Sequence, residues 1–321
     1  MTIGRLLEVC TLKDDMEIEV PIMYRIFKKL YLYYIYDKAY GDIESVKYLD
    51  YEGFRLTLPL SQEVIQELEP WQLEVLYLRH LELLSEQDIK ICLASDPRII
   101  PEDLTLPVIT KENISILLVN YLLDEIVKFM PMDHKDMKLA LICDDNDLSE
   151  LILGAVYNRF NYLTLISENP SYYDDIIEGI FDYNGLMVLT NDFDVKSIDA
   201  DIIINLSNAQ LKLHHVLNKG IVFIDFVHNV YLKKNIENKR KDIIWIDDFT
   251  IKARDQCIRK EIFEMILYIE KPLLFRELIH SNYRMVDIRE IEGCISSYHV
   301  AIHQLYNGAQ MIKREKIVNT R

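Results

Sequence analysis

The sequence predicts a mainly all-α protein built as a stack of helical repeats. A short apolar phrase recurs along it, led by Leu93, Leu118, Leu141, Leu165 and Leu189. The step from one phrase to the next is nearly constant at about 24 residues, which is typical of repeats that bury their apolar faces against their neighbours. The chain also has only 9 Gly and 9 Pro in 321 residues, too few for the turns of an all-β protein.

The N-terminal segment, residues 1–60, does not follow this step. Met16–Val20 alternates apolar and polar side chains as a strand does, and a helix is predicted over 23–40, after Pro21 and before Gly41. We therefore expect this segment to form a small mixed α/β N-terminal cap.

Residues 61–232 are predicted to form the regular array. Each unit has a helix that ends in the recurring phrase, a polar turn such as Ser95–Pro97 or Ser167–Pro170, and a second short apolar segment that follows acidic residues. Asp and Asn accept backbone N–H groups at such turns, and Pro stops the preceding helix. This pattern suits a two-helix unit of about 24 residues.

Two of these units resemble a known family. Leu93–Pro97 followed by Ile100–Leu104, and the stretch Leu165–Ile177, are similar to leucine-rich repeat variant units and to the wider group of HEAT-like α-solenoids. The resemblance covers about residues 85–208. It implies a right-handed superhelix with a concave binding face and no catalytic residues.

Beyond Asn208 the step becomes irregular. The basic stretch Lys233–Lys241 is predicted to be an exposed polar loop and the best break in the chain. Residues 242–321 are then expected to form an irregular C-terminal helical region.

A binding or scaffolding function follows from this architecture. The polar residues at the ends of the repeated phrases would lie along one edge of the stack, where each either caps a helix or contacts a protein partner. The predicted partner-binding residues are Asp96, Asn120, Asp144, Asn169 and Asn191. Two alternatives use the same array: a viral or phage assembly protein that self-associates as a homo-oligomer, and an acidic decoy for a nucleic-acid-binding protein.

The charge is unevenly distributed. Residues 221–321 carry 17 Lys or Arg and 14 Asp or Glu, which leaves 19 and 38 for residues 1–220 from totals of 36 and 52. The strongly acidic part should repel phosphates and lipid headgroups, so neither a membrane nor a nucleic acid is expected there. Nucleic acid is not an expected partner, and any contact with it is expected only through one basic group, which is more typical of a solvated loop: Lys233, Lys234, Lys239, Arg240 and Lys241.

No pattern indicates catalysis, a cofactor or a metal. The sequence lacks G-x-S-x-G, G-x-G-x-x-G and P-loop motifs, so we predict that the protein is not an enzyme. Cys294, His299 and His303 have ligand-like spacing, with both histidines on one predicted helix face, but no fourth ligand. The acidic run Asp144–Asp147 lacks the Gly of a calcium loop, so it is interpreted as a turn whose acids cap a helix.

The five cysteines are dispersed and contain no C-x-x-C pair, which is typical of reduced thiols in the cytoplasm. Asp14 and Asp15 interrupt the N-terminus before any apolar run long enough for a signal peptide, and no run of 18 apolar residues is present. A cytoplasmic protein is predicted, in the host cytoplasm or the virion for the viral alternative.

Overall fold

The computed structural model describes residues 5–12, 42–61, 69, 87–94, 106–109, 113–279, 282–286, 288–313 and 317. The chain divides into two compact units, Met1–Glu112 with Glu261–His280, and Asn113–Lys260 with Ser281–Arg321. We call them unit 1 and unit 2 and describe each by itself. The segment boundaries predicted from the sequence stay a prediction.

Unit 1 contains a five-stranded sheet in the order β2-β3-β1-β4-β5. Its strands are β1 (Arg5–Leu12), β2 (Asp42–Tyr48), β3 (Tyr51–Ser61), β4 (Ile89–Ala94) and β5 (Val108–Ile109). The central strand β1 pairs in parallel with β3 and β4, while β2 and β3 form an antiparallel hairpin. Two helices follow later in the chain, α10 (Lys260–Glu270) and α11 (Pro272–Ile279), and the Tyr51 hydroxyl donates to Glu270 Oε1 at 2.6 Å.

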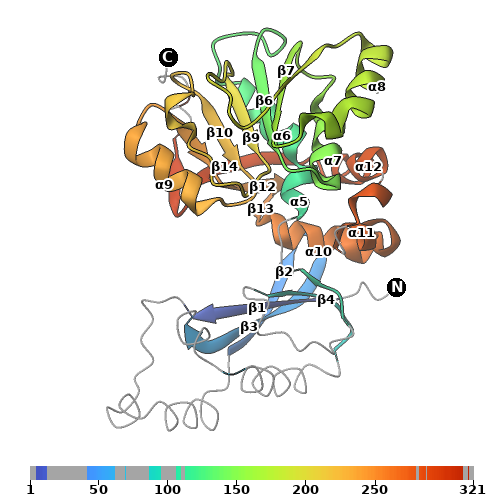
Figure 1. Cartoon of the computed structure of the whole chain (residues 1–321). Helices are drawn as coiled ribbons and strands as arrows, with labels where there is room; N and C mark the ends of the chain where they lie inside the picture. Colours follow the sequence, from blue (N-terminus) through green and yellow to red (C-terminus); the bar gives the residue numbers. More distant parts are fainter. Residues whose placement is uncertain are drawn as a thin grey trace. The chain divides into compact units, whose positions relative to one another are not determined.

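Unit 2 is organised around a six-stranded sheet in the order β11-β10-β9-β6-β7-β8, with every neighbouring pair parallel. Its strands are β6 (Lys138–Cys143), β7 (Tyr162–Ser167), β8 (Val188–Asn191), β9 (Ile202–Asn205), β10 (Val222–Asp225) and β11 (Ile244–Ile246). Numbered along the chain, this order is 3-2-1-4-5-6, the order of the doubly wound Rossmann-type sheet. Figure 1 shows the four central strands of this sheet, β10, β9, β6 and β7, side by side.

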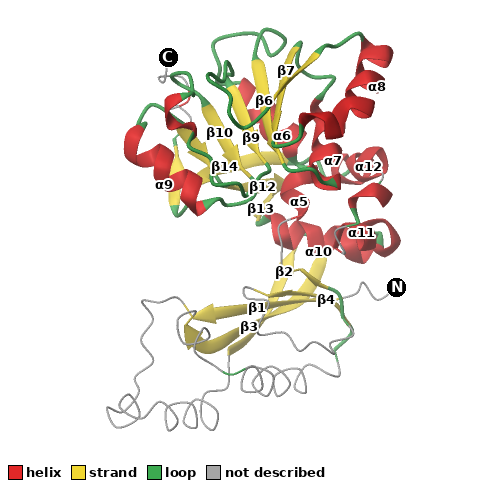
Figure 2. Cartoon of the chain, in the orientation of Figure 1, coloured by secondary structure: helices red, strands yellow, loops and turns green. Residues whose placement is uncertain are grey.

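Helices cover the two faces of this sheet, as Figure 2 shows. The connections from β6 to β8 run outward in one direction and those from β9 to β11 in the other, so right-handed crossovers place their helices on opposite faces. The helices of unit 2 are α5 (Asn113–Leu117), α6 (Val119–Val127), α7 (Asp147–Val156), α8 (Asp174–Asn184), α9 (Val230–Lys239) and α12 (Ile288–Ser296). Short 3-10 turns occur at η2 (Pro170–Tyr173), η3 (Leu213–His215) and η4 (Tyr283–Met285).

A second sheet of unit 2 has four antiparallel strands in the order β13-β12-β14-β15. Its strands are β12 (Asp248–Ala253), β13 (Gln256–Ile258), β14 (Ala301–Asn307) and β15 (Gln310–Ile312). Across the described residues of both units, no helix is long and apolar enough to cross a membrane.

The prediction of a mainly all-α, HEAT-like or leucine-rich repeat variant superhelix is therefore wrong. The recurring phrase is real, but it marks strands: Leu93, Leu141, Leu165 and Leu189 lie in β4, β6, β7 and β8, and Leu118 directly precedes α6. A strand, a turn, a helix and a second turn together take about the same length as a two-helix repeat. A short buried strand is apolar along its whole length, so periodicity alone does not distinguish it from a buried helix segment.

The core on one face of the parallel sheet is built mostly from branched aliphatic side chains. Phe223 of β10 and Trp245 of β11 stack in it, with ring centroids 4.4 Å apart and planes 7° from parallel. Leu232 and Ile236 of α9 pack into the same cluster, together with Ala140, Ile142, Ile166, Ile198, Ala200, Ile203, Leu213, Val216, Leu217, Ile221 and Ile243.

Replacing Phe223 with Ala should lower the free energy of unfolding by about 3–5 kcal/mol, because it removes a fully buried ring and leaves a cavity beside Trp245. Phe181→Ala is the matched control, since this ring on α8 is 52% exposed and should change stability by about 0.5 kcal/mol or less. Urea unfolding followed by circular dichroism measures both. Equal losses would contradict the placement of Phe223 in the core.

Candidate functional site

The candidate site lies at the carboxyl edge of the six-stranded sheet, where β6 and β9 are neighbours. The chain leaves β6 toward β7 and returns to β9 on its other side, so this is the point at which the strand order reverses. Ligands of open α/β sheets bind in the crevice outside the carboxyl ends of the strands at such a point. We call this region the switch-point site.

Polar residues end each strand around this point. The apolar runs of β6, β7, β9 and β10 finish at Cys143, Ser167, Asn205 and Asp225, and all four side chains are buried. Parallel strands end at the same edge, so these polar side chains are gathered there although they are widely separated in sequence.

Asp225 is the most enclosed acid of the site, with a relative exposure of 1%. Its Oδ1 accepts from Asn205 Nδ2 at 2.9 Å and its Oδ2 accepts from the backbone N–H of Asn229 at 2.8 Å. Burial raises the pKa of Asp225, while these hydrogen bonds and the nearby charge of His228 act in the opposite direction. The carboxyl group is therefore easier to protonate than an exposed aspartate.

Asn229 connects Asp225 to the next loop. It caps α9 by accepting from the backbone N–H of Leu232 at 3.0 Å, and its amide donates to the carbonyl oxygens of Ser207 at 3.3 Å and Ala209 at 3.0 Å. The loop after β9 and the start of α9 are thus held against each other by one buried side chain.

The turn between β6 and α7 is strongly acidic. Asn146 caps α7 by accepting from the backbone N–H of Ser149 at 2.9 Å, and Asp144, Asp145 and Asp147 surround it in sequence. In a dinucleotide-binding Rossmann domain this turn is glycine-rich, and the ligand's pyrophosphate lies at the helix N-terminus.

Groups from the neighbouring strand ends already bind these carboxylates. Ser207 Oγ donates to Asp144 Oδ1, and Ser167 Oγ donates to Asp145 Oδ1 at 2.8 Å. The Tyr173 hydroxyl donates to the carbonyl oxygen of Asp144 at 2.5 Å. The protein's own side chains therefore hold negative charge at the place where a diphosphate would bind.

Arg284 compensates part of this charge, because its Nε donates to Asp147 Oδ1 at 2.8 Å. Burial raises the pKa of the Cys143 thiol to about 12, so Cys143 is protonated at neutral pH and is no nucleophile. Burial likewise raises the pKa of Tyr173, so its phenol is a neutral hydrogen-bond donor.

Three of the predicted partner-binding residues meet at this edge. Asp144 and Asn169 follow β6 and β7, and Asn191 is the last residue of β8. Asn120 lies elsewhere, in α6, where its Nδ2 donates to Ala155 O at 3.2 Å and to Glu292 Oε1 at 3.0 Å. Asp96 lies outside the described residues. The role of these five residues in partner binding stays a prediction.

Sequence reasoning missed the buried part of the site. Asn205, Asp225 and Asn229 were not singled out, although the first two directly follow the runs Ile202–Ile204 and Val222–Ile224. A polar residue at the end of a short β-branched run is the signal that identifies them once the runs are read as strands.

The predicted basic loop is instead mostly the helix α9, and several of its cations are engaged within unit 2. Lys233 Nζ pairs with Asp247 Oδ2 at 2.6 Å, and Lys239 Nζ lies 3.1 Å from His214 Nε2. Arg240 pairs with Asp242 at 2.7 Å and also donates to the carbonyl oxygens of His214, Leu217 and Asn218. Lys234 and Lys241 are exposed. Binding of nucleic acid by this group stays a prediction.

The predicted histidine pair does not share a helix face. Cys294 lies in α12, His299 in the turn that follows it, and His303 in β14. Within the described ranges, no three His, Cys, Asp or Glu side chains are grouped so that they could hold a metal ion. The acidic run Asp144–Asp147 contributes the cap of α7, and it connects a strand to a helix rather than two helices.

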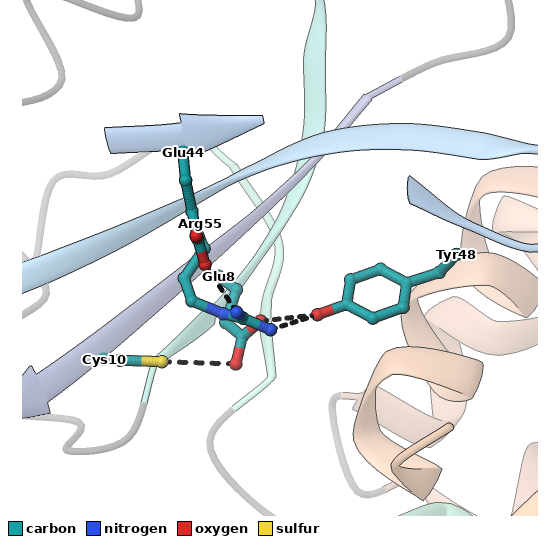
Figure 3. A network of polar contacts seen from close by, with 5 residues as sticks. All are labelled: Glu8, Cys10, Glu44, Tyr48 and Arg55. Atoms are coloured by element: carbon teal, nitrogen blue, oxygen red, sulfur yellow. Dashed lines mark hydrogen bonds and ion pairs between the residues drawn. The ribbon is translucent and has the colours of Figure 1, made fainter. Parts of the chain in front are cut away.

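Unit 1 contains a separate polar network around Glu8 of β1, which Figure 3 shows. Glu8 is 2% exposed; its Oε2 accepts from Arg55 Nε at 3.0 Å and from the Tyr48 hydroxyl at 3.1 Å, and its Oε1 accepts from Cys10 Sγ at 3.2 Å. Arg55 also pairs with Glu44 at 2.5 Å. Burial by itself would lower the pKa of Arg55. The interactions with Glu8 and Glu44 outweigh burial, so the pKa of Arg55 is raised above its ordinary value.

No protein-family model matches the chain, and no curated protein sequence matches it. Among solved structures, the L-tryptophan dehydrogenase from Nostoc punctiforme is 11% identical, over 98% of this chain and 81% of its own, with a TM-score of 0.39. A shikimate dehydrogenase in complex with NADP+ is 12% identical, over 92% and 95%, with a TM-score of 0.34. The quinate dehydrogenase from Corynebacterium glutamicum in complex with NAD is 11% identical, over 92% and 99%, with a TM-score of 0.32.

Similarities at these TM-scores do not assign the fold, which rests on the strand order of unit 2. The prediction of a non-enzymatic repeat or scaffold protein was built on a helical array, and it is wrong because a parallel sheet stands in place of that array. The self-associating and decoy alternatives are withdrawn with the array. The prediction that the chain is not an enzyme is corrected as well, because it was tied to the helical array, and the parallel sheet in its place has the strand order of a ligand-binding doubly wound sheet.

Asp225→Asn tests the buried carboxyl group. Because the folded-state pKa of Asp225 is raised, its protonated form stabilises the fold, and that contribution is lost as the pH rises through the folded pKa. Relative to Asp225→Asn, the wild-type protein should thus gain unfolding free energy as the pH falls from 7 toward the ordinary aspartate pKa. Urea unfolding at several pH values measures this; a pH-independent difference would contradict it.

Arg55→Met should lower the free energy of unfolding by about 3 kcal/mol, because it removes the guanidinium group that pairs with the buried Glu8 carboxylate. Glu44→Gln breaks the exposed pair of the same arginine and should cost about 1 kcal/mol or less, since the Glu44 side chain is 56% exposed. Chemical denaturation compares the two. Equal losses of unfolding free energy would show that the pair with Glu8 stabilises the protein no more than the exposed pair with Glu44 does.

Proposed function

We propose that the protein is an enzyme whose switch-point site binds a small nucleoside-like ligand that has a cationic group in place of a diphosphate. The observation that carries this proposal is the acidic, glycine-free turn between β6 and α7 on a sheet of order 3-2-1-4-5-6. The sheet supports a ligand across the switch point, and the turn selects its charge.

The residues present do not fit a dinucleotide bound in the usual way. The stretch Cys143–Ser149 has no Gly to let a diphosphate approach the backbone, and three aspartates would face its negative charge. Two unit charges about 4 Å apart interact by about 4 kcal/mol at an effective dielectric constant of 20, so even one such contact is costly. The same carboxylates would attract an amine or a sulfonium group.

The end of β7 favours ligand hydroxyl groups. In Rossmann domains an acid about 20 residues after the glycine-rich turn binds ribose hydroxyls. Glu168 stands directly after β7, at a comparable separation from the turn after β6, and it is exposed. It is available to accept hydrogen bonds from a sugar.

The reacting end of the ligand would lie at β10. His228 is exposed, follows the buried Asp225 closely in sequence and has a φ of 52°. A non-glycine residue in this left-handed region costs on the order of 1 kcal/mol or more and is enriched at functional sites. An imidazole beside a buried carboxylate is a suitable group for transferring a proton to or from a bound ligand.

The five cysteines are free thiols, and three of them are half-buried or exposed. Free thiols of this kind persist in reducing compartments, which supports a cytoplasmic site of action.

Isothermal titration calorimetry with S-adenosylmethionine, adenosine, NAD+ and NADH tests the ligand class. S-adenosylmethionine carries both a nucleoside and a cation and should bind most tightly, and the double variant Asp144→Asn with Asp145→Asn should weaken its binding at least tenfold, about 1.4 kcal/mol. Asp133→Asn, an exposed aspartate before β6, is the matched control and should leave the affinity unchanged.

Each variant is first checked for an unchanged thermal unfolding midpoint, because Asp144 and Asp145 also accept structural hydrogen bonds. Tighter binding of NAD+ or NADH than of S-adenosylmethionine would overturn the proposal and favour a dinucleotide.

A further inference from the structure

The sheet of unit 2 has an open face at its β8 end. The crossover from β8 to β9, residues 192–201, contains no helix, although parallel strands are usually connected through one. Ile198 and Ala200 of this crossover pack into the core cluster, so it follows the face that α9 covers farther along the sheet. The part of that face over β7 and β8 is left uncovered.

A groove of about 880 Å³ occupies this place. Its floor is formed by side chains that alternate along the two strands and are in register, Thr164 opposite Leu189 and Ile166 opposite Asn191. The groove also contacts Lys138, Tyr162 and Asp199 at the amino ends of the strands, so most of it lies away from the switch-point site, although Asn191 at the carboxyl end of β8 also lines it.

Apolar side chains are exposed at this groove. Tyr162 is 54% exposed, Met187 69% and Leu189 58%. The one ionic pair of its lining is internal, because Lys138 binds Asp199. Amide groups, which both donate and accept hydrogen bonds, are added by Asn158, Asn161, Asn184 and Asn191. A surface whose two charges are paired with each other and which mixes apolar and amide groups suits a polypeptide main chain with apolar side chains.

The edge of the sheet here is open as well. β8 is the last strand in the order, and among the described residues it pairs only with β7. Its sequence, Val-Leu-Thr-Asn, contains no Lys or Pro, the residues that usually protect an edge strand from pairing. A further strand can therefore add to it by main-chain hydrogen bonds.

The charge around the groove decides between possible occupants. In the crossover that borders the groove, residues 192–200, the single cation is Lys196, and three carboxylates are exposed: Asp192, Asp194 and Asp199. The whole chain has a formal net charge of −16. A second copy of the chain would bring the same negative surface against this one. A segment with flanking Lys or Arg would be attracted instead.

We propose that the groove and the free edge of β8 together bind an extended polypeptide segment with apolar residues at alternate positions and basic residues at its flanks. The added strand pairs with β8, its alternate side chains lie on Leu189 and Met187, and its basic flanks face the carboxylates of the crossover after β8. This site is separate from the proposed enzyme site and does not depend on it.

A library of random decapeptides displayed on phage, selected on the full chain, tests this proposal. The recovered peptides should alternate apolar residues and carry Lys or Arg at their flanks. In fluorescence anisotropy, the best of them should bind at least tenfold more weakly to Leu189→Lys, and its binding should also weaken as salt is raised. Val230→Lys is the matched control, since Val230 is 61% exposed on α9 and outside the groove; it should change the affinity less than twofold.

Circular dichroism and thermal unfolding show whether Leu189→Lys is folded, and the milder variant Leu189→Ser, which should reduce the affinity to a smaller extent, replaces it if it is not. No enrichment of peptides, enrichment without basic flanks, or equal binding to the Leu189 and Val230 variants would overturn the proposal. So would a concentration-dependent dimer in light scattering that Leu189→Lys abolishes, because the occupant would then be a second copy of this chain.

Discussion

The pairing of β6 with β7 on one side and β9 on the other is the constraint on which unit 2 depends. Because the six strands are parallel and the side chains of the central strands are buried on both faces, β6, β9 and β10 leave little room for charge between their ends. Polar residues are thus confined to the strand ends. Since parallel strands end at the same edge of the sheet, the polar residues that end the separate strands gather at one place.

The negative charge of the carboxylates gathered at this edge must be compensated by hydrogen bonds and cations. Asp225 is buried with two hydrogen bonds, and the carboxylates after β6 accept the hydroxyls of Ser207 and Ser167 and pair with Arg284. A helix N-terminus stabilises negative charge, so the start of α7 favours these acids in the same way as it would favour a phosphate. One electrostatic feature of the fold therefore serves two exclusive purposes: binding an anionic ligand, or holding the protein's own anions and leaving a cation-binding surface.

The local sequence indicated where the apolar segments of unit 2 end, but it did not show that these segments are strands. The regular spacing led to Asp144 and Asn169 as members of one group, and both do follow strands of the sheet. The error was in the element type, because a run such as Leu139–Cys143 is buried on every side and has no periodicity that distinguishes strand from helix. The hydrogen bond from Asn205 to Asp225 could not be predicted at all, since it exists only once the strand order is known. Charge counts describe what a segment carries, whereas topology decides which of those charges remain for a ligand.

The same distinction separates the two surfaces of unit 2. At the carboxyl edge, the acids of the turn after β6 are bound by hydroxyl groups and by Arg284, so their charge is fixed in place by hydrogen bonds. Beside the groove at β8, the crossover that follows the strand carries the exposed carboxylates Asp192, Asp194 and Asp199, while the ionic pair of the groove's lining is internal. A fixed charge discriminates between ligands by distance and direction, while a diffuse, exposed one attracts a partner at longer range and is screened by salt. The first is suited to selecting a small molecule and the second to drawing in a basic polypeptide, so one acidic composition supports two different kinds of recognition on a single sheet.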